Sequence, residues 1–174
     1  GRRSRSPGAA LSPSGDRFAV IESDKDGRTV YVRQTADGKV IRALRFGTAK
    51  LRGLTWAGDD HLLIINTATM KLSEPGARKH EWEGVIHLDL RGNTPPAMLL
   101  AKSNTYVDAI FGWYGAAQVG GHWYAYVGAV PLAVTQEWSR SAIFAELYRI
   151  NLEDGKVELV AHSTERDRSW LVRL

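Results

Sequence analysis

Cysteine is absent from this chain of 174 residues. Its absence excludes a disulfide scaffold, a thiolate metal site and a cysteine nucleophile, but it leaves the compartment open, because proteins without disulfides occur in the cytoplasm and in the periplasm. Long apolar runs are also missing, since no window approaches 18 uncharged apolar residues. We therefore expect no membrane span and no membrane partner.

The usual catalytic and phosphate-binding signatures are missing as well. The chain contains no Gly-x-Ser-x-Gly, no Gly-x-Gly-x-x-Gly and no P-loop. Nucleophilic catalysis needs a serine on a strained turn together with a histidine base and an acid. We expect this chain by itself to be without a catalytic triad, and to need no cofactor.

Charge of one sign does not dominate. The chain has 23 Lys and Arg residues against 19 Asp and Glu residues, a formal net charge of +4. A nucleic-acid binder would gather its basic residues on one face. Three arginines lie in a basic arm over residues 1–8, whereas most others alternate with acids, so we expect no nucleic-acid partner. The arm lacks an initial Met and an apolar leader segment, which suggests a chain processed or cut from something longer.

A short pattern of strand, glycine turn and apolar strand recurs along the chain. Ser12-Pro13-Ser14-Gly15 has the residues of a type I turn and precedes the apolar run Phe18–Ile21. The same order returns around Gly58 and again around Gly120. The continuous apolar runs after these turns favour strands that are buried on both faces.

A second hairpin signal repeats at a fixed distance from a tyrosine. Asp37-Gly38-Lys39 follows Tyr31, and Asp154-Gly155-Lys156 follows Tyr148 at the same spacing. Asp-Gly between two strands predicts a tight hairpin. The central copy of this turn is Arg91-Gly92-Asn93.

Together these signals describe a unit of four short strands joined by hairpins, which is typical of a β-propeller blade. We predict an all-β fold, a partial β-propeller with about three four-stranded antiparallel blades. The blades are expected at residues 9–45, 50–101 and 106–161, with the start of another at 168–174. A β-sandwich is the structural alternative, but it does not account for the repeated four-strand order.

Three blades do not close a ring, because propellers have about four to eight. An open ring leaves unpaired strand edges and exposed blade faces, which favour pairing with another chain. We therefore expect either that the chain is a fragment or that it self-associates through its open blade edges.

Two blades carry long insertions between their second and third strands, at residues 66–83 and 128–143. We expect structureless loops here, on the same face of the propeller, and loops of this length are commonly functional. Each insertion holds a tryptophan beside a glutamate, with an arginine nearby. The candidate substrate- or partner-contact residues are Arg78, Glu81, Trp82, Glu83, Glu137, Trp138 and Arg140. Alternatively, each tryptophan packs its own loop onto the blade.

Metal sites find little support in the sequence. His80, Glu81 and Glu83 match no zinc-ligand spacing. Residues 24–27 resemble the start of a calcium loop, but the later acidic ligands are missing, and Thr29 and Val30 follow instead. We expect a hairpin turn at residues 24–27 and no bound metal.

Four phrases of the sequence resemble a known family. They are LSPSGDRFAVIES (11–23), LRGLTWAGDDHLLI (51–64), YGAAQVGGHWYAYVG (114–128) and LYRINLEDGKVELVA (147–161). In this order they are similar to the N-terminal β-propeller of bacterial prolyl-oligopeptidase-like (S9) serine peptidases. The resemblance covers nearly the whole chain from about Ala9 onward.

The resemblance implies a function for the propeller. In that family the propeller caps an α/β-hydrolase domain and restricts entry to short peptides, and in dipeptidyl members paired glutamates bind the free amine of the substrate. None of the family's triad positions exists here, and Glu81 and Glu83 are not adjacent, which departs from the paired-glutamate pattern. The implied partners are the hydrolase domain of the same parent protein and a peptide substrate.

We therefore predict a propeller fragment of a serine peptidase that gates and orients short peptides. The alternative is a stand-alone protein- or peptide-binding propeller scaffold that is completed by self-association. The resemblance implies a bacterial protein of the periplasm or the cytoplasm.

Overall fold

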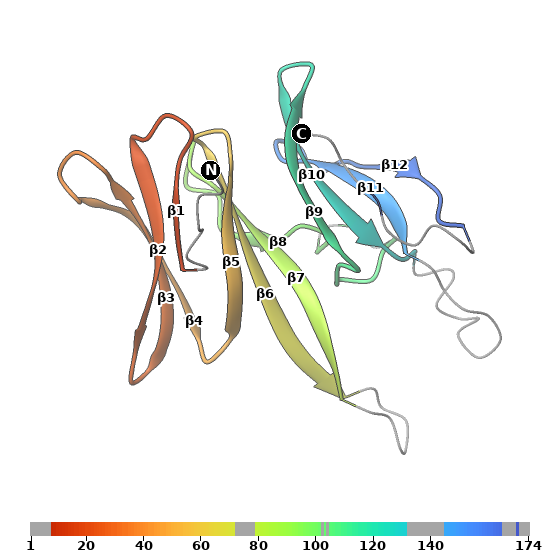
Figure 1. Ribbon diagram of the computed structural model, residues 1–174, viewed down its shortest axis with the longest axis horizontal. Coiled ribbons are helices and arrows are strands. Elements are labelled where there is room, and N and C mark those ends of the chain that lie inside the picture. Colours follow the sequence, from red (N-terminus) through yellow and green to blue (C-terminus); the bar gives the residue numbers. More distant parts are fainter. Residues whose placement is uncertain are drawn as a thin grey trace, which may run out of the picture.

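The computed structural model describes residues 8–71, 79–101, 103, 105–131, 145–164 and 170. Its twelve strands form three sheets (Figure 1). Sheet one comprises β1 (Ala9–Leu11), β2 (Arg17–Asp24), β3 (Gly27–Gln34) and β4 (Val40–Gly47). Sheet two comprises β5 (Lys50–Ala57), β6 (His61–Lys71), β7 (Lys79–Asp89) and β8 (Ala97–Met98). Sheet three comprises β9 (Trp113–Val119), β10 (His122–Ala129), β11 (Glu146–Asn151) and β12 (Val157–Ala161).

Each sheet follows the order of its strands along the chain, and neighbouring strands are antiparallel. The first strand of sheet two, β5, contacts β1 of sheet one and β9 of sheet three. The first strands of the three sheets are therefore neighbours in space (Figure 1). The predicted all-β class with three four-stranded antiparallel blades is confirmed. Among the described residues there is no helix that could span a membrane.

The β6–β7 hairpin corrects one prediction. Residues 66–83 were expected to form a structureless loop, but β6 and β7 pair without a break from His61↔Asp89 to Lys71↔Lys79. The β-branched Thr67 suits an extended, half-exposed strand, and strand pairing satisfies backbone groups that a loop would leave to water. Of this insertion only residues 72–78 lie outside the described residues.

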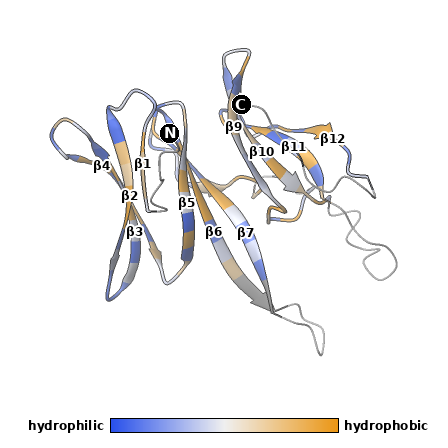
Figure 2. Ribbon diagram, viewed as in Figure 1, coloured by the Kyte–Doolittle hydropathy of each residue, from blue (hydrophilic) through white to orange (hydrophobic). Residues whose placement is uncertain are grey.

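Sheet two forms the centre of the core, because it is buried on both faces. Leu62 and Ile64 of β6 face sheet one and pack with Val30, whereas Leu63 and Ile65 face sheet three. All four side chains of β6 are at most 8 % exposed, and burying each contributes about 2 kcal/mol. We call the packed apolar interface between two neighbouring sheets a seam. The continuous apolar run of β6 is therefore explained by the position of this strand between the seam with sheet one and the seam with sheet three (Figure 2).

Turns of neighbouring sheets are joined by hydrogen bonds. The Gly15 N–H donates to the carbonyl oxygen of Ser12 at 3.0 Å, as expected for the predicted turn. From this turn the Ser14 N–H donates to Asp59 Oδ1 at 2.9 Å, and Arg17 Nη1 donates to the carbonyl oxygen of Asp59 at 2.7 Å. The Ser14 N–H lowers the pKa of the Asp59 carboxyl. The turn thus ties sheet one to the β5–β6 turn of sheet two.

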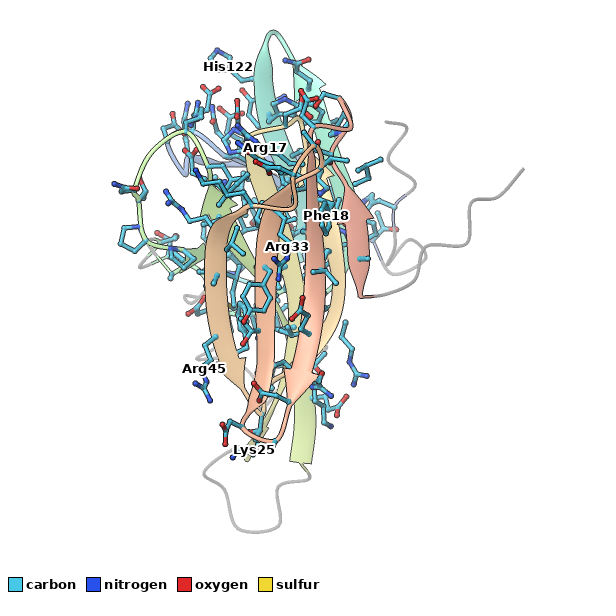
Figure 3. All side chains as sticks on the ribbon, turned by 90° about the vertical axis from the view of Figure 1, so that its left-hand side faces the viewer. Arg17, Phe18, Lys25, Arg33, Arg45 and His122 are labelled. Atoms are coloured by element: carbon cyan, nitrogen blue, oxygen red, sulfur yellow. The ribbon has the colours of Figure 1, made fainter. Side chains whose placement is uncertain are left out.

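The face of sheet one turned away from sheet two is mixed in character (Figure 3). Phe18 lies opposite Arg33 in the β2–β3 pairing, and the Arg33 guanidinium lies 5.0 Å from the centre of the Tyr31 ring. Arg33 also pairs with Glu22 at 3.3 Å. Leu11, opposite Phe18 in the β1–β2 pairing, is 57 % exposed. The outward face therefore combines an exposed apolar residue with a cationic group held over an aromatic ring.

Candidate functional site

Three of the candidate contact residues lie on β7, in the extended part of the β6–β7 hairpin. Glu81, Trp82 and Glu83 pair with Thr69, Ala68 and Thr67 of β6, respectively. The other four candidates, Arg78, Glu137, Trp138 and Arg140, lie outside the described residues. The structure thus places part of one insertion on a regular strand.

Glu81 is held by two cations from the inner strand β5. Its carboxylate accepts hydrogen bonds from Lys50 Nζ and, at 3.2 Å, from Arg52 Nη2. Arg52 also donates from Nε to Thr67 Oγ1 at 3.1 Å. The Lys50 and Arg52 cations lower the pKa of the Glu81 carboxyl. Glu81 is therefore already neutralised by this protein's own residues.

Glu83 lies on the same side of β7 as Glu81, two residues further along. Its side chain is half-buried, and burial raises the pKa of this carboxyl, partly offset by the charge of Arg52. Among the described residues, none forms an ion pair with the Glu83 carboxylate. The Glu83 carbonyl oxygen accepts the Ile110 N–H at 2.8 Å, which ties the strand to the segment leading into sheet three. Glu83 is thus the less neutralised of the two carboxylates.

Trp82 packs against an aromatic ring of the segment that leads into sheet three. Its ring meets that of Phe111 edge to face, with ring centroids 5.4 Å apart. The Trp82 side chain is half-buried, whereas Phe111 is 37 % exposed. The observed partner belongs to the segment that leads into sheet three and not to the tryptophan's own blade, and the pair leaves an aromatic edge at the surface.

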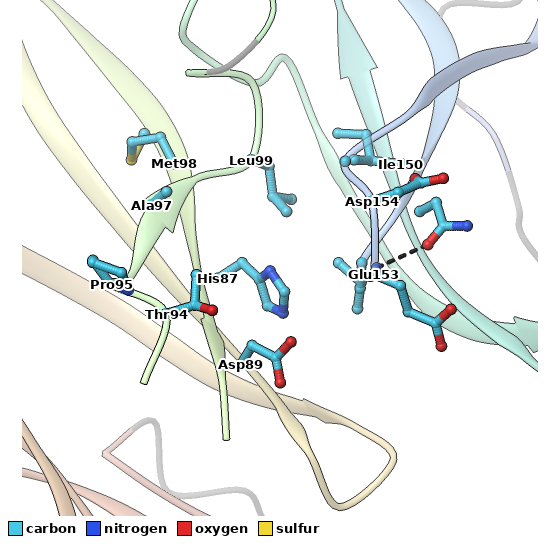
Figure 4. Close-up of a pocket in the computed structure, with 13 residues that line it drawn as sticks. His87, Asp89, Thr94, Pro95, Ala97, Met98, Leu99, Ile150, Glu153 and Asp154 are labelled. Carbon is cyan, nitrogen blue, oxygen red and sulfur yellow. Dashed lines mark hydrogen bonds between the residues drawn. The ribbon is translucent and has the colours of Figure 1, made fainter. Parts of the chain in front are cut away.

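A cavity of about 240 Å³ lies between sheets two and three. It is lined by the end of β7, by Met98 and Leu99, and by the β11–β12 turn (Figure 4). His87 and Asp89 face Glu153 and Asp154 across it. The lining of the cavity therefore combines carboxylates with apolar side chains.

Two histidines meet beside this cavity. His61 Nδ1 and His87 Nε2 are 2.9 Å apart, and His61 is only 2 % exposed. Burial lowers the pKa of His61, and the neighbouring carboxyl of Asp89 partly offsets this. No motif in the sequence singles out either histidine. Their contact follows from the strand register, in which His61 lies opposite Asp89 and Leu63 lies opposite His87, so that the two histidines are diagonal neighbours on one face.

A chain of charged groups links the two sheets next to the histidines. Arg91 binds Asp89 through Nη2 at 2.7 Å and through Nε at 3.0 Å, and its Nη1 lies 3.6 Å from Glu153. His122 Nδ1 lies 2.6 Å from the same Glu153. The Arg91 hydrogen bonds lower the pKa of Asp89 to about 2. This part of the seam is therefore held by ion pairs as well as by apolar packing.

Metal binding has no support from the arrangement of side chains. No group of three or more His, Asp or Glu side chains suited to a metal ion occurs in the part of the chain that the structure describes. Residues 24–27 form the turn of the β2–β3 hairpin, with Asp24 opposite Gly27.

Comparison with known proteins finds two solved structures of low similarity. No family model matches the sequence, and no curated protein matches it. Hydrazine synthase of Kuenenia stuttgartiensis has a TM-score of 0.45 at 14 % identity, over 89 % of this chain and 58 % of that one. A puromycin-hydrolyzing peptidase of Mycobacterium tuberculosis has a TM-score of 0.36 at 16 % identity, over 92 % of this chain and 29 % of that one. The chain thus spans less than two thirds of either protein.

Proposed function

We propose that this chain is the propeller portion of a serine peptidase similar to the prolyl-oligopeptidase family. In this role it admits and orients short peptides for an α/β-hydrolase domain. The chain's own sheets form a scaffold, and bond cleavage belongs to the hydrolase domain.

The observation that carries the proposal is the position of the family-like phrases in the fold. The phrase at 11–23 forms the β1–β2 hairpin of sheet one, and the phrase at 51–64 covers the equivalent β5–β6 turn of sheet two. The phrases at 114–128 and 147–161 supply the four strands of sheet three. A sequence resemblance that falls on equivalent hairpins of successive blades supports a shared architecture rather than a chance match of short turns.

On the described part of the β6–β7 hairpin, the proposed peptide-contact residues are Glu81, Trp82 and Glu83. The other proposed contact residues, Arg78, Glu137, Trp138 and Arg140, lie outside the described residues. Within it, Glu83 is the carboxylate better suited to accept a hydrogen bond from a peptide amine, since Lys50 and Arg52 already bind Glu81. In the parent peptidase, Glu83→Gln is expected to raise KM for short peptides more than it lowers kcat.

The first test is the reading frame of the gene. A Gly-x-Ser-x-Gly segment is expected several hundred codons downstream, and a stop codon soon after that of Leu174 would overturn the peptidase proposal. The 174-residue chain alone is expected not to hydrolyse dipeptide p-nitroanilides. Turnover that a serine-reactive phosphonate abolishes would contradict the assignment of chemistry to another domain.

One observation favours the alternative of a self-associating binding scaffold. The outward face of sheet one exposes Leu11, and Val40 on the last strand of the same sheet is 42 % exposed. A second copy could cover such a blade face. The downstream reading frame of the gene distinguishes the two proposals. The peptidase proposal requires a Gly-x-Ser-x-Gly segment there, whereas a binding scaffold needs no downstream nucleophile.

A further inference from the structure

The seam between sheets two and three contains a pair of histidines that the proposed function does not use. Both lie on the β6–β7 hairpin, on the face turned toward sheet three, as shown by Leu63 and Val85 on the same face. His61 is 2 % exposed, and His87 lines the cavity between the sheets. Their rings are 5.1 Å apart between centroids. The pair is therefore placed where protonation affects the contact between two blades.

The distance between the two ring nitrogens restricts how many protons the pair can hold. At 2.9 Å one nitrogen donates a hydrogen and the other accepts it. One added proton can go to an outer nitrogen and leaves this bond intact. A second added proton would place two N–H groups against each other and two cations side by side. The closed pair thus accepts one proton, whereas separated imidazoles accept two.

Charged groups face the pair from both sheets. Asp60 and Asp89 of sheet two and Glu153 of sheet three favour the protonated state of His61, and Arg91 opposes it. Arg91 is bound to Asp89 and lies 3.6 Å from Glu153, so part of the acidic charge is already compensated. His122 also binds Glu153, and the Asp154 carboxylate lines the same cavity as His87. Burial of His61 remains the largest influence, and it disfavours the charged form.

We propose that His61 and His87 form a proton-sensitive latch between sheets two and three, closed near neutral pH and loosened in acid. This inference does not depend on the peptidase proposal.

The direction follows from proton linkage. Burial lowers the pKa of His61 below its ordinary value of 6.5, so an opened seam binds more protons than the closed seam once the pH falls below 6.5. The stability that the neutral pair contributes is present above that pH and is lost as the pH falls through the lowered pKa. For each extra proton bound, the equilibrium for opening rises up to about tenfold per pH unit.

Because the chain contains no cysteine, a single introduced thiol can report on opening. Ala125 of β10 and Ala19 of β2 are both 0 % exposed. Ala125 lies in the seam between sheets two and three, and Ala19 lies in the seam between sheets one and two. Ala125→Cys is therefore the reporter and Ala19→Cys the matched control, each labelled with 4,4′-dithiodipyridine and corrected against a thiol peptide.

The ratio of labelling rates, Cys at 125 over Cys at 19, is expected to rise several-fold between pH 7.5 and 5.5, with an upper limit of about tenfold per pH unit for one proton. Introducing His61→Asn with His87→Gln keeps side-chain amides near the two bonded nitrogens and removes both titrating groups. In this background the ratio is expected to stay constant with pH. A constant ratio in the parent chain, or an acid-dependent rise that survives both substitutions, would overturn the proposal.

A second measurement does not depend on the double variant folding. Imidazole NMR of the unsubstituted chain is expected to show uptake of one proton by the pair while it remains folded. Two complete, independent titrations of His61 and His87 near 6.5 in the folded protein would also overturn the proposal.

Discussion

Gly58 offers a stringent test of the contact between sheets two and three. It lies in the β5–β6 turn with φ +62°, a conformation that favours glycine. A Cβ added at Gly58 would come within 2.7 Å of Trp123 Nε1 and 3.1 Å of Trp123 Cε2. Trp123 belongs to sheet three and packs against the core of that seam. Gly58→Ala therefore imposes a backbone cost and a steric cost together.

Gly120 separates the two costs. It occupies the equivalent β9–β10 turn with φ +59°, and no atom lies within 4 Å of its added Cβ. Gly120→Ala is expected to lose about 1–2 kcal/mol from the left-handed backbone alone. Gly58→Ala is expected to lose the same amount plus about 1–3 kcal/mol for displacing the Trp123 indole from a packed seam.

Urea unfolding followed by circular dichroism measures both changes at constant m-value. A double-mutant cycle with Trp123→Ala isolates the steric part, because alanine lacks the whole ring that the new Cβ would meet. The cost of Gly58→Ala should fall toward that of Gly120→Ala in the Trp123→Ala background. Equal destabilisation by Gly58→Ala and Gly120→Ala in the unsubstituted chain would refute the reasoning.

Three further predictions concern other contacts. Asp89→Asn should cost about 1–2 kcal/mol at pH 7. Arg91 lowers the pKa of Asp89 from 3.8 to about 2, so this stability is present above pH 3.8 and is lost as the pH falls toward 2. If the parent chain and the Asp89→Asn variant have the same urea midpoint at pH 7, this prediction is wrong. Trp56→Phe removes the indole N–H that donates to the Ala10 carbonyl oxygen at 3.0 Å and should cost about 1 kcal/mol in the same assay; an unchanged midpoint would show that this bond adds no net stability. The 174-residue chain should self-associate through the exposed face that includes Leu11, seen as a concentration-dependent sedimentation coefficient; a monomer at high concentration would argue against open-face pairing.

Much of the fold was readable from the sequence, because turns and strand patterns are local. Gly15, Gly58 and Gly120 all adopt positive φ in the structure. Each lies in the turn of a hairpin that the glycine-containing turn sequence predicted. The run Leu62–Ile65 predicted burial on both faces, and it lies between two seams. Such signals depend on residues close together in the chain, so they survive without knowledge of the packing.

The length of the β6–β7 hairpin was not readable in the same way. Its outer residues carry polar and charged side chains, which are equally typical of a loop. What makes them strands is the pairing of Thr67 with Glu83 and the cations that β5 brings to Glu81. Both depend on partners far away in the sequence, and no local periodicity reports them.

By itself the sequence determined the all-β class, the repeated four-strand unit and the hairpin turns, because glycine, proline and Asp-Gly act on the backbone where they stand. Only the tertiary structure brought His61 to His87, neutralised Glu81 with Lys50 and Arg52, and tied the LSPSGD turn to Asp59. These contacts are decided by strand register and by the packing of one sheet on the next. Register is strongly specified only where a face of the strand is buried, and which face is buried depends on the neighbouring sheet.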